Sequence, residues 1–298
     1  MASSPDAFPA GQDPPSHGRW RMGALLGQGG LGRVFLAHDG AGRAVALRVV
    51  RASLARDEEF RRCFGREVRA LSAVRGPRVA ALVDADPQAE VPWLAMEYAA
   101  GPTLATRVRE LGGPLGGPLP VPELRTLANA LAGALDGIHR AGLVHGGLRP
   151  SNVLLTAEGP RVADFGLAGC AARAGYTGRP GYAAPELVTH GAPRPSADVF
   201  SLGAVLAFAA AGRGPFDTGG DKPDLAGVPE ELLPLVTACL AGHPTARPAP
   251  RTVARMAGLP LSGSRRRALT LAGTLFLAQL AAVASPLGGR WTSRTVER

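Results

Sequence analysis

The sequence predicts an α+β protein in which strand-forming segments come first and long helices follow. Short apolar segments at Ala44–Val50 and at Trp93–Gly101 have the form of strands. Val121–Ala141 and Ser196–Gly212 are long, rich in Ala and Leu, and spaced like helices. About 240 residues of this mixed pattern are enough to bury a core of two lobes. We therefore expect a small N-terminal lobe of antiparallel strands with one helix, and a larger helical C-terminal lobe.

A glycine-rich run precedes the first of these segments. Gly27, Gly29 and Gly32 have the GxGxxG spacing, and Val34 follows two residues later. Glycines let a backbone approach phosphate oxygens and adopt positive φ. The chain has 40 glycines, so this spacing alone is weak evidence for a phosphate site.

Four further motifs follow in a fixed order, and together with the glycine-rich run they span about 220 residues. They are Asp164–Gly166 (DFG), Ala184–Glu186 (APE), Asp198–Gly203 (DVFSLG) and Arg247 with Pro248. With these motifs in this order, the stretch from about Trp20 to Met256 resembles the bacterial serine/threonine protein kinases. The resemblance implies a two-lobed protein-kinase-like fold, with an N-lobe at 19–100, a C-lobe at 101–260, and an Arg247–Glu186 ion pair.

The same resemblance implies ATP and Mg²⁺ as cofactors. The glycine-rich run would cover the phosphates, and Val34, Ala46 and Leu154 would sandwich the base. The remaining positions at the nucleotide are Met96, which would guard the back of the cleft, and Glu97 and Ala99, near which backbone groups would bind adenine. Asn152 and Asp164 would hold the metal ion.

Two further positions, Arg48 and Glu67, would lie near the phosphates. Arg48 replaces the Lys that contacts phosphates in this family and pairs with a helix Glu. Glu67 lies at the position of that Glu on a helical stretch at 58–74, and Leu71 would face the core one turn later. Taken alone, Glu67 also fits an exposed, solvated carboxylate.

The catalytic loop lacks its carboxylate. His145–Asn152 matches the kinase loop in length, but Gly147 stands where the catalytic Asp belongs. Arg149 replaces the Lys two residues later, and Arg179 replaces an activation-segment Thr. Gly146 replaces the Arg that binds a phosphorylated activation loop in this family. The positions around the missing carboxylate have thus changed together, and none of the expected catalytic residues is intact.

Three functions remain open. The leading hypothesis is a membrane-anchored pseudokinase that binds ATP with Mg²⁺ and serves protein partners in signalling as a scaffold or regulator. The alternative is an active serine/threonine kinase with an atypical loop, against which Gly147 and Arg179 argue. The third is a nucleotide-free structural adaptor, against which Asp164 and Asn152 argue.

Composition adds exclusions. The formal net charge is +9, and Lys222 is the one lysine among 33 basic residues. Because arginines are scattered along the chain, we expect no nucleic-acid partner. Cys63, Cys170 and Cys239 are far apart, which suggests neither a disulfide framework nor a metal site.

The two ends of the chain differ from its body. Residues 1–18 have the composition of a disordered leader. The region 264–287 holds an arginine cluster and the uncharged stretch Ala268–Ser285, which as a helix is about 27 Å long and suits a transmembrane span. Arginine bias predicts a cytoplasmic kinase-like body and a short external tail at 288–298. An extra core helix packed on the C-lobe is the alternative.

Overall fold

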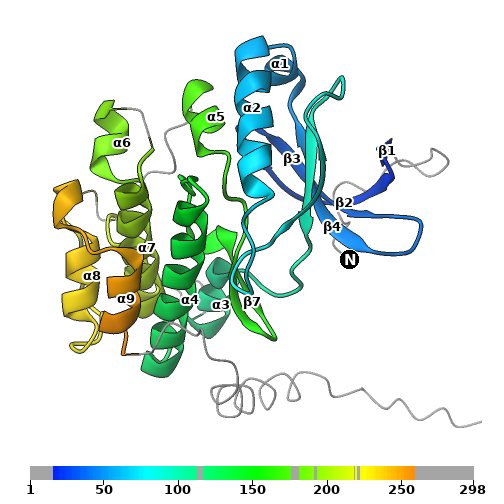
Figure 1. The fold of residues 1–298 in the computed structure, drawn as a ribbon. Coiled ribbons are helices and arrows are strands. Elements are labelled where there is room, and N and C mark those ends of the chain that lie inside the picture. The colour runs from blue at the N-terminus through cyan, green and yellow to red at the C-terminus, as the bar shows by residue number, and fades with distance from the viewer. Residues whose placement is uncertain are drawn as a thin grey trace, which may run out of the picture. The chain divides into compact units, whose positions relative to one another are not determined.

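The computed structural model describes residues 16–112, 117–175, 181–190, 193–217, 219 and 222–258. Its N-terminal part is a six-stranded antiparallel sheet in the order β1-β2-β3-β4-β6-β5 (Figure 1). The strands are β1 (Ser16–His17), β2 (Trp20–Gly29), β3 (Gly32–His38), β4 (Ala44–Val50), β5 (Leu82–Asp86) and β6 (Trp93–Glu97). The strand predicted at 44–50 is thus confirmed.

Alternation along the strands gives this sheet two different faces. One face buries a small cluster of its own, made of Trp20, Met22, Ala37, Val45, Leu47, Trp93 and Ala95. Leu94 and Met96 belong instead to the main core. Because Ala46 pairs with Met96 and Arg48 with Leu94 in the register, Ala46 and Arg48 lie on that second face.

The N-lobe helix that crosses this face is α2 (Glu58–Leu71), preceded by the short α1 (Ala52–Ala55). Asp57 caps α2 by accepting hydrogen bonds from the amides of Glu59 and Phe60 at 2.9 and 3.1 Å. Acidic residues in the first turn also suit the positive end of the helix dipole. The helix ends three residues before the predicted limit at 74, and Leu71 is fully buried.

The C-terminal part is helical, as the sequence predicts. Its helices are α3 (Leu104–Gly112), α4 (Val121–Arg140), α5 (Ala168–Arg173), α6 (Pro185–His190), α7 (Pro195–Ala211), α8 (Leu233–Cys239) and α9 (Pro250–Met256). Both α4 and α7 have a proline in their first two positions, where its missing N–H costs nothing. Gly212 ends α7 in the left-handed conformation at φ 78°.

The main core connects the lobes. It contains Phe64 and Leu71 from α2, Leu131 from α4 and Leu202 from α7. The central helix α7 buries residues on every side, which is typical of a helix in the middle of a core. Between the lobes lies a hairpin of β7 (Val153–Thr156) and β8 (Gly159–Val162), entered through the 3₁₀ turn Pro150–Asn152.

Some predicted segments differ from the structure or lie outside it. β1 begins at Ser16, so residues 16–18 of the predicted disordered leader form a short strand and the start of a turn. Residues 1–15, Arg179 and the region 264–298 lie outside the described residues. In the part of the chain that is described, none of the helices combines the length and the apolarity that crossing a bilayer requires. The described residues of 217–229 contain no helix.

Candidate functional site

The glycine-rich run forms the hairpin between β2 and β3. Gly27 pairs with Val34, and Gly29 pairs with Gly32. A Cβ atom at Gly32, where φ is 149°, would lie 2.0 Å from the Val49 carbonyl oxygen, so packing against β4 requires glycine there. At Gly27 and Gly29 the Cβ position has no neighbour within 4 Å. These two glycines leave the backbone open to a ligand.

The predicted walls of the adenine cleft come from three strands. Val34 lies on β3, Ala46 on β4 and Leu154 on β7, and all three are half-buried. Met96 and Ala99 are buried at the end of β6 and just beyond it. These five predicted positions thus lie on β3, β4, β6 and β7 and directly after β6.

The carboxylate of Glu97 has a role that the sequence did not indicate. It accepts a hydrogen bond from Arg161 Nη2 at 2.6 Å and one from the Ala81 amide at 3.3 Å. Arg161 also donates to the Val79 carbonyl oxygen. Glu97 thus joins the end of β6 to β8, and its backbone stays the part expected to meet a nucleotide.

Arg48 forms an ion pair with Asp164. The guanidinium Nη2 contacts Asp164 Oδ1, and the Arg48 side chain is buried while Asp164 is 38% exposed. Asp164 has φ 60°, a left-handed conformation that Asp tolerates better than most side chains. Arg48, which replaces the family's lysine, is therefore paired with the Asp164 carboxylate that was predicted to hold Mg²⁺.

Glu67 does not make the predicted pair with position 48. Its carboxylate accepts hydrogen bonds from the backbone amides of Gly169 and Cys170, at 2.8 and 3.3 Å. These amides lie in the first turn of α5, where N–H groups have no partner within the helix and attract negative charge. Among the described residues no ion pair joins Arg48 to Glu67, because each has found another partner.

The helix α5 lies against α2, as Figure 1 also shows. It belongs to the segment after Gly166 that the resemblance makes the activation segment. Arg173 at the end of α5 forms an ion pair with Glu59. Glu59 lies on α2 two turns before Glu67, on the same side of the helix. This arrangement holds α2 and the activation segment together.

The catalytic loop is held in place but lacks a base. The fully buried Asp198 accepts hydrogen bonds from the amides of His145 and Gly146, both at 2.8 Å, and lies 2.7 Å from His139 Nε2. At Gly147 nothing lies within 4 Å of the Cβ position. The structure therefore has room for the missing aspartate, and its absence has no steric cause.

Gly146 is different. Its φ is 65°, and a Cβ there would lie 2.3 Å from the Cβ of Ala168, the first residue of α5. The arginine that this family has at the position could not be restored unless α5 moved. The docking of α5 and the loss of the loop arginine are therefore linked.

His145 is a buried part of the same loop. Burial lowers the pKa of its imidazole, so the neutral form is favoured. The ring lies 6.3 Å from that of Phe165, centroid to centroid. His145 and Asp198 are site-positioning residues that the sequence analysis did not assign, although the DVFSLG motif contains one of them.

Asn152 keeps its place next to the loop. Its Nδ2 donates to the Gly147 carbonyl oxygen at 2.9 Å, and its Oδ1 accepts from Arg149 Nε at 3.4 Å. Both predicted metal ligands, Asp164 and Asn152, thus contact a guanidinium group. Amide and carboxylate oxygens suit Mg²⁺, but positive charge already lies beside each of them.

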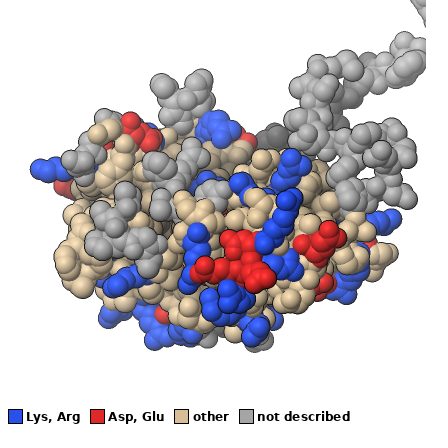
Figure 2. All heavy atoms as spheres, turned by 90° about the horizontal axis from the view of Figure 1, so that it is seen from above, with Lys and Arg blue, Asp and Glu red and all other residues tan. Residues whose placement is uncertain are grey.

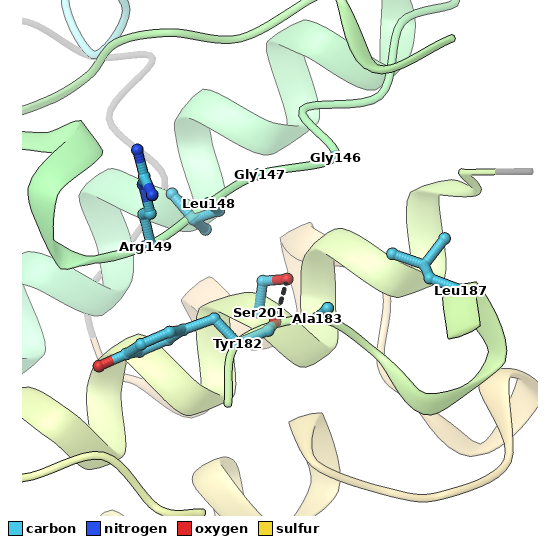
Figure 3. Close-up of a pocket in the computed structure, with 8 residues that line it drawn as sticks. All are labelled: Gly146, Gly147, Leu148, Arg149, Tyr182, Ala183, Leu187 and Ser201. Carbon is cyan, nitrogen blue, oxygen red and sulfur yellow. Dashed lines mark hydrogen bonds between the residues drawn. The ribbon is translucent and has the colours of Figure 1, made fainter. Parts of the chain in front are cut away.

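A small pocket lies beside Gly147 of the catalytic loop (Figure 3). It is lined by Gly146, Gly147, Leu148, Arg149, Tyr182, Ala183, Leu187 and Ser201. Ser201 Oγ donates to the Tyr182 carbonyl oxygen at 2.8 Å. None of these lining residues carries a carboxylate, so none can accept a hydroxyl proton as the family's Asp does.

The ion pair implied between Arg247 and Glu186 is confirmed. Arg247 Nη1 and Nη2 lie 2.6 and 2.8 Å from the two Glu186 carboxylate oxygens. The Arg247 side chain is 0% exposed, donates to three backbone carbonyl groups as well, and stacks on Phe200. A buried bidentate pair of this kind fixes the end of the activation segment to the C-lobe.

Charges on the face seen in Figure 2 are mixed. Acidic side chains gather near its centre, and arginines surround them instead of forming a continuous basic stripe.

The fold and the order of these motifs agree with the comparisons to known proteins. The family described as "Protein kinase domain" matches residues 20–257. This chain belongs to that family. Among solved structures, the kinase domain of Mycobacterium tuberculosis PknI matches with a TM-score of 0.69 and 29% identity, over 84% of this chain and 98% of that domain.

Curated relatives are bacterial serine/threonine-protein kinases. The chain is 43% identical over 269 residues to the serine/threonine-protein kinase AfsK of Streptomyces coelicolor, covering 85% of this chain and 33% of that protein. It is 42% identical over 252 residues to the probable serine/threonine-protein kinase PkwA of Thermomonospora curvata, covering 79% of this chain and 33% of that one. The chain thus spans about a third of the length of these relatives.

Proposed function

We propose that this chain is a nucleotide-binding, catalytically impaired kinase that acts in signalling as a scaffold or regulator of a protein partner. The observation that supports this most is the well-formed catalytic loop without a carboxylate at Gly147 or in the pocket beside it. A catalytic base contributes roughly 10² to 10⁴ in rate. Its loss, with Arg48 and Arg149 on the two predicted metal ligands, removes both proton transfer and the usual charge arrangement.

ATP is the proposed ligand of the cleft. The open backbone at Gly27 and Gly29 and the half-buried Val34, Ala46 and Leu154 fit a nucleotide. Asp164 and Asn152 have the oxygen ligands that would hold Mg²⁺, which neutralises phosphate charge when bound. Because Arg48 already brings a positive charge to Asp164, we propose that ATP binding depends on Mg²⁺ less than is usual in this family.

A titration of the full chain with a fluorescent ATP analogue, with and without Mg²⁺, tests this proposal. We expect saturable binding in both conditions, with less than a roughly tenfold change in Kd on removal of Mg²⁺. Asp164→Asn should abolish the remaining Mg²⁺ dependence. Asp224→Asn is a matched control, since Asp224 also pairs with an arginine, Arg213, but at a place distant from the predicted cleft. No binding in either condition would favour the nucleotide-free adaptor.

We also propose that the stretch Ala268–Ser285 anchors the protein in the cell membrane, with the kinase domain on the cytoplasmic side. The support is the uncharged composition of this stretch and the arginine cluster Arg265–Arg267 that precedes it. Full-length protein should stay in the membrane fraction after salt and carbonate washes and be released by detergent. Release by carbonate alone would contradict anchoring and favour a surface-bound or packed helix.

A further inference from the structure

Two cysteines and a carboxylate meet where α2 contacts α5. Cys63 and Glu67 lie one turn apart on α2, and Cys170 lies on α5. The Sγ atoms of the cysteines and a carboxylate oxygen of Glu67 all lie within 4.8 Å of one another. The spacing of these residues along the chain does not predict the cluster, because the activation segment brings Cys170 to α2 only in the folded chain.

These three groups have the chemistry of a soft divalent cation site. Thiolates and carboxylates are ordinary Zn²⁺ ligands, at about 2.3 Å for sulfur and 2.0–2.2 Å for oxygen. Tetrahedral geometry at those bond lengths separates the ligand atoms by roughly 3.5–3.8 Å. The observed cluster therefore needs only small side-chain shifts to close around an ion.

The surroundings of the cluster are consistent with this role. Both cysteines are buried, and burial together with the neighbouring Glu67 carboxylate raises the pKa of the Cys170 thiol. Without a cation the Cys170 thiol therefore stays protonated, and Zn²⁺ would release its proton on binding. Glu67 is already oriented, because it accepts hydrogen bonds from the amides of Gly169 and Cys170. Such support from outside the ligand shell is typical of metal sites.

We propose that Cys63, Glu67 and Cys170 form a Zn²⁺ site that cross-links α2 to the activation-segment helix α5. Three protein ligands leave the fourth position to water, as in open zinc sites. A bound ion would keep Glu67 on α5 and therefore away from Arg48. This site would stabilise the contact between α2 and α5 whether or not a nucleotide occupies the cleft. The proposal therefore does not depend on the proposed function.

The test is a metal titration of the metal-stripped, reduced full chain. Co²⁺ serves as the spectroscopic probe, because thiolate ligands give an intense charge-transfer absorption, and Zn²⁺ is measured against a competing chromophoric chelator. We expect one equivalent of each ion to bind. Cys63→Ala and Cys170→Ala should weaken binding by at least about tenfold and remove charge-transfer intensity, and Glu67→Gln should weaken binding while keeping the thiolate band.

Cys239→Ala is the matched control. Cys239 is equally buried but lies on α8, so its loss should leave the titration unchanged. Thermal unfolding of each variant shows whether it is folded, and Glu67→Gln carries the test if a cysteine variant is not. Absence of stoichiometric binding, or binding that survives Cys170→Ala, would overturn the proposal. The proposal would also be overturned if the protein took up no metal and hydrogen peroxide joined Cys63 and Cys170 in a disulfide. That result would show that the two thiols serve in oxidation and not in metal binding.

Discussion

Restoring the aspartate by Gly147→Asp alone is expected to leave phosphate transfer at least about 10²-fold below that of an intact relative. The new side chain has room, since no atom lies within 4 Å of the Cβ position. It would enter a site in which Arg149 lies two residues away and Arg48 holds Asp164. A carboxylate there would form ion pairs with guanidinium groups instead of orienting a hydroxyl.

The comparison that isolates this effect is a triple reversion. Arg48→Lys, Gly147→Asp and Arg149→Lys together should transfer phosphate faster than Gly147→Asp alone, because a compact ammonium replaces each planar guanidinium. Rates are measured with radiolabelled ATP and a generic protein substrate. If the single variant reaches the rate of an intact relative, the coupling among these positions is overrated.

Arg247→Ala is expected to lower the free energy of unfolding by about 3–5 kcal/mol, because it removes a bidentate ion pair whose guanidinium group is fully buried. Chemical denaturation of the purified variant measures the loss. Arg213→Ala is the control, since it breaks a more exposed pair with Asp224 and should cause a much smaller change. Equal effects of the two variants would show that the buried pair has no special structural role.

Much of the fold could be predicted from local signals. The strand at 44–50 and the long helices α4 and α7 follow from apolar periodicity, and their observed bounds agree with the predicted ones within one residue. The Arg247–Glu186 pair was also implied correctly, since both residues belong to recognisable motifs.

The partners of charged side chains could not be predicted in the same way. Glu67 was expected near Arg48, but it binds the amides of α5, and Arg48 binds Asp164. That choice depends on where a short helix of the activation segment packs, which periodicity does not determine. The meeting of Cys63 with Cys170 depends on the same packing. The packing of Ala168 against Gly146 shows how the altered loop admits α5.

The chain folds as a protein kinase, and we propose that it transfers no measurable phosphate. The most direct measurement incubates purified full-length protein with radiolabelled ATP and Mg²⁺, with and without a generic substrate, beside an Asp164→Ala variant prepared in parallel. We expect no incorporation above background in either protein, because no group at Gly147 accepts the hydroxyl proton. Incorporation by the natural protein that disappears in Asp164→Ala would show that the chain is an active kinase and would overturn this proposal.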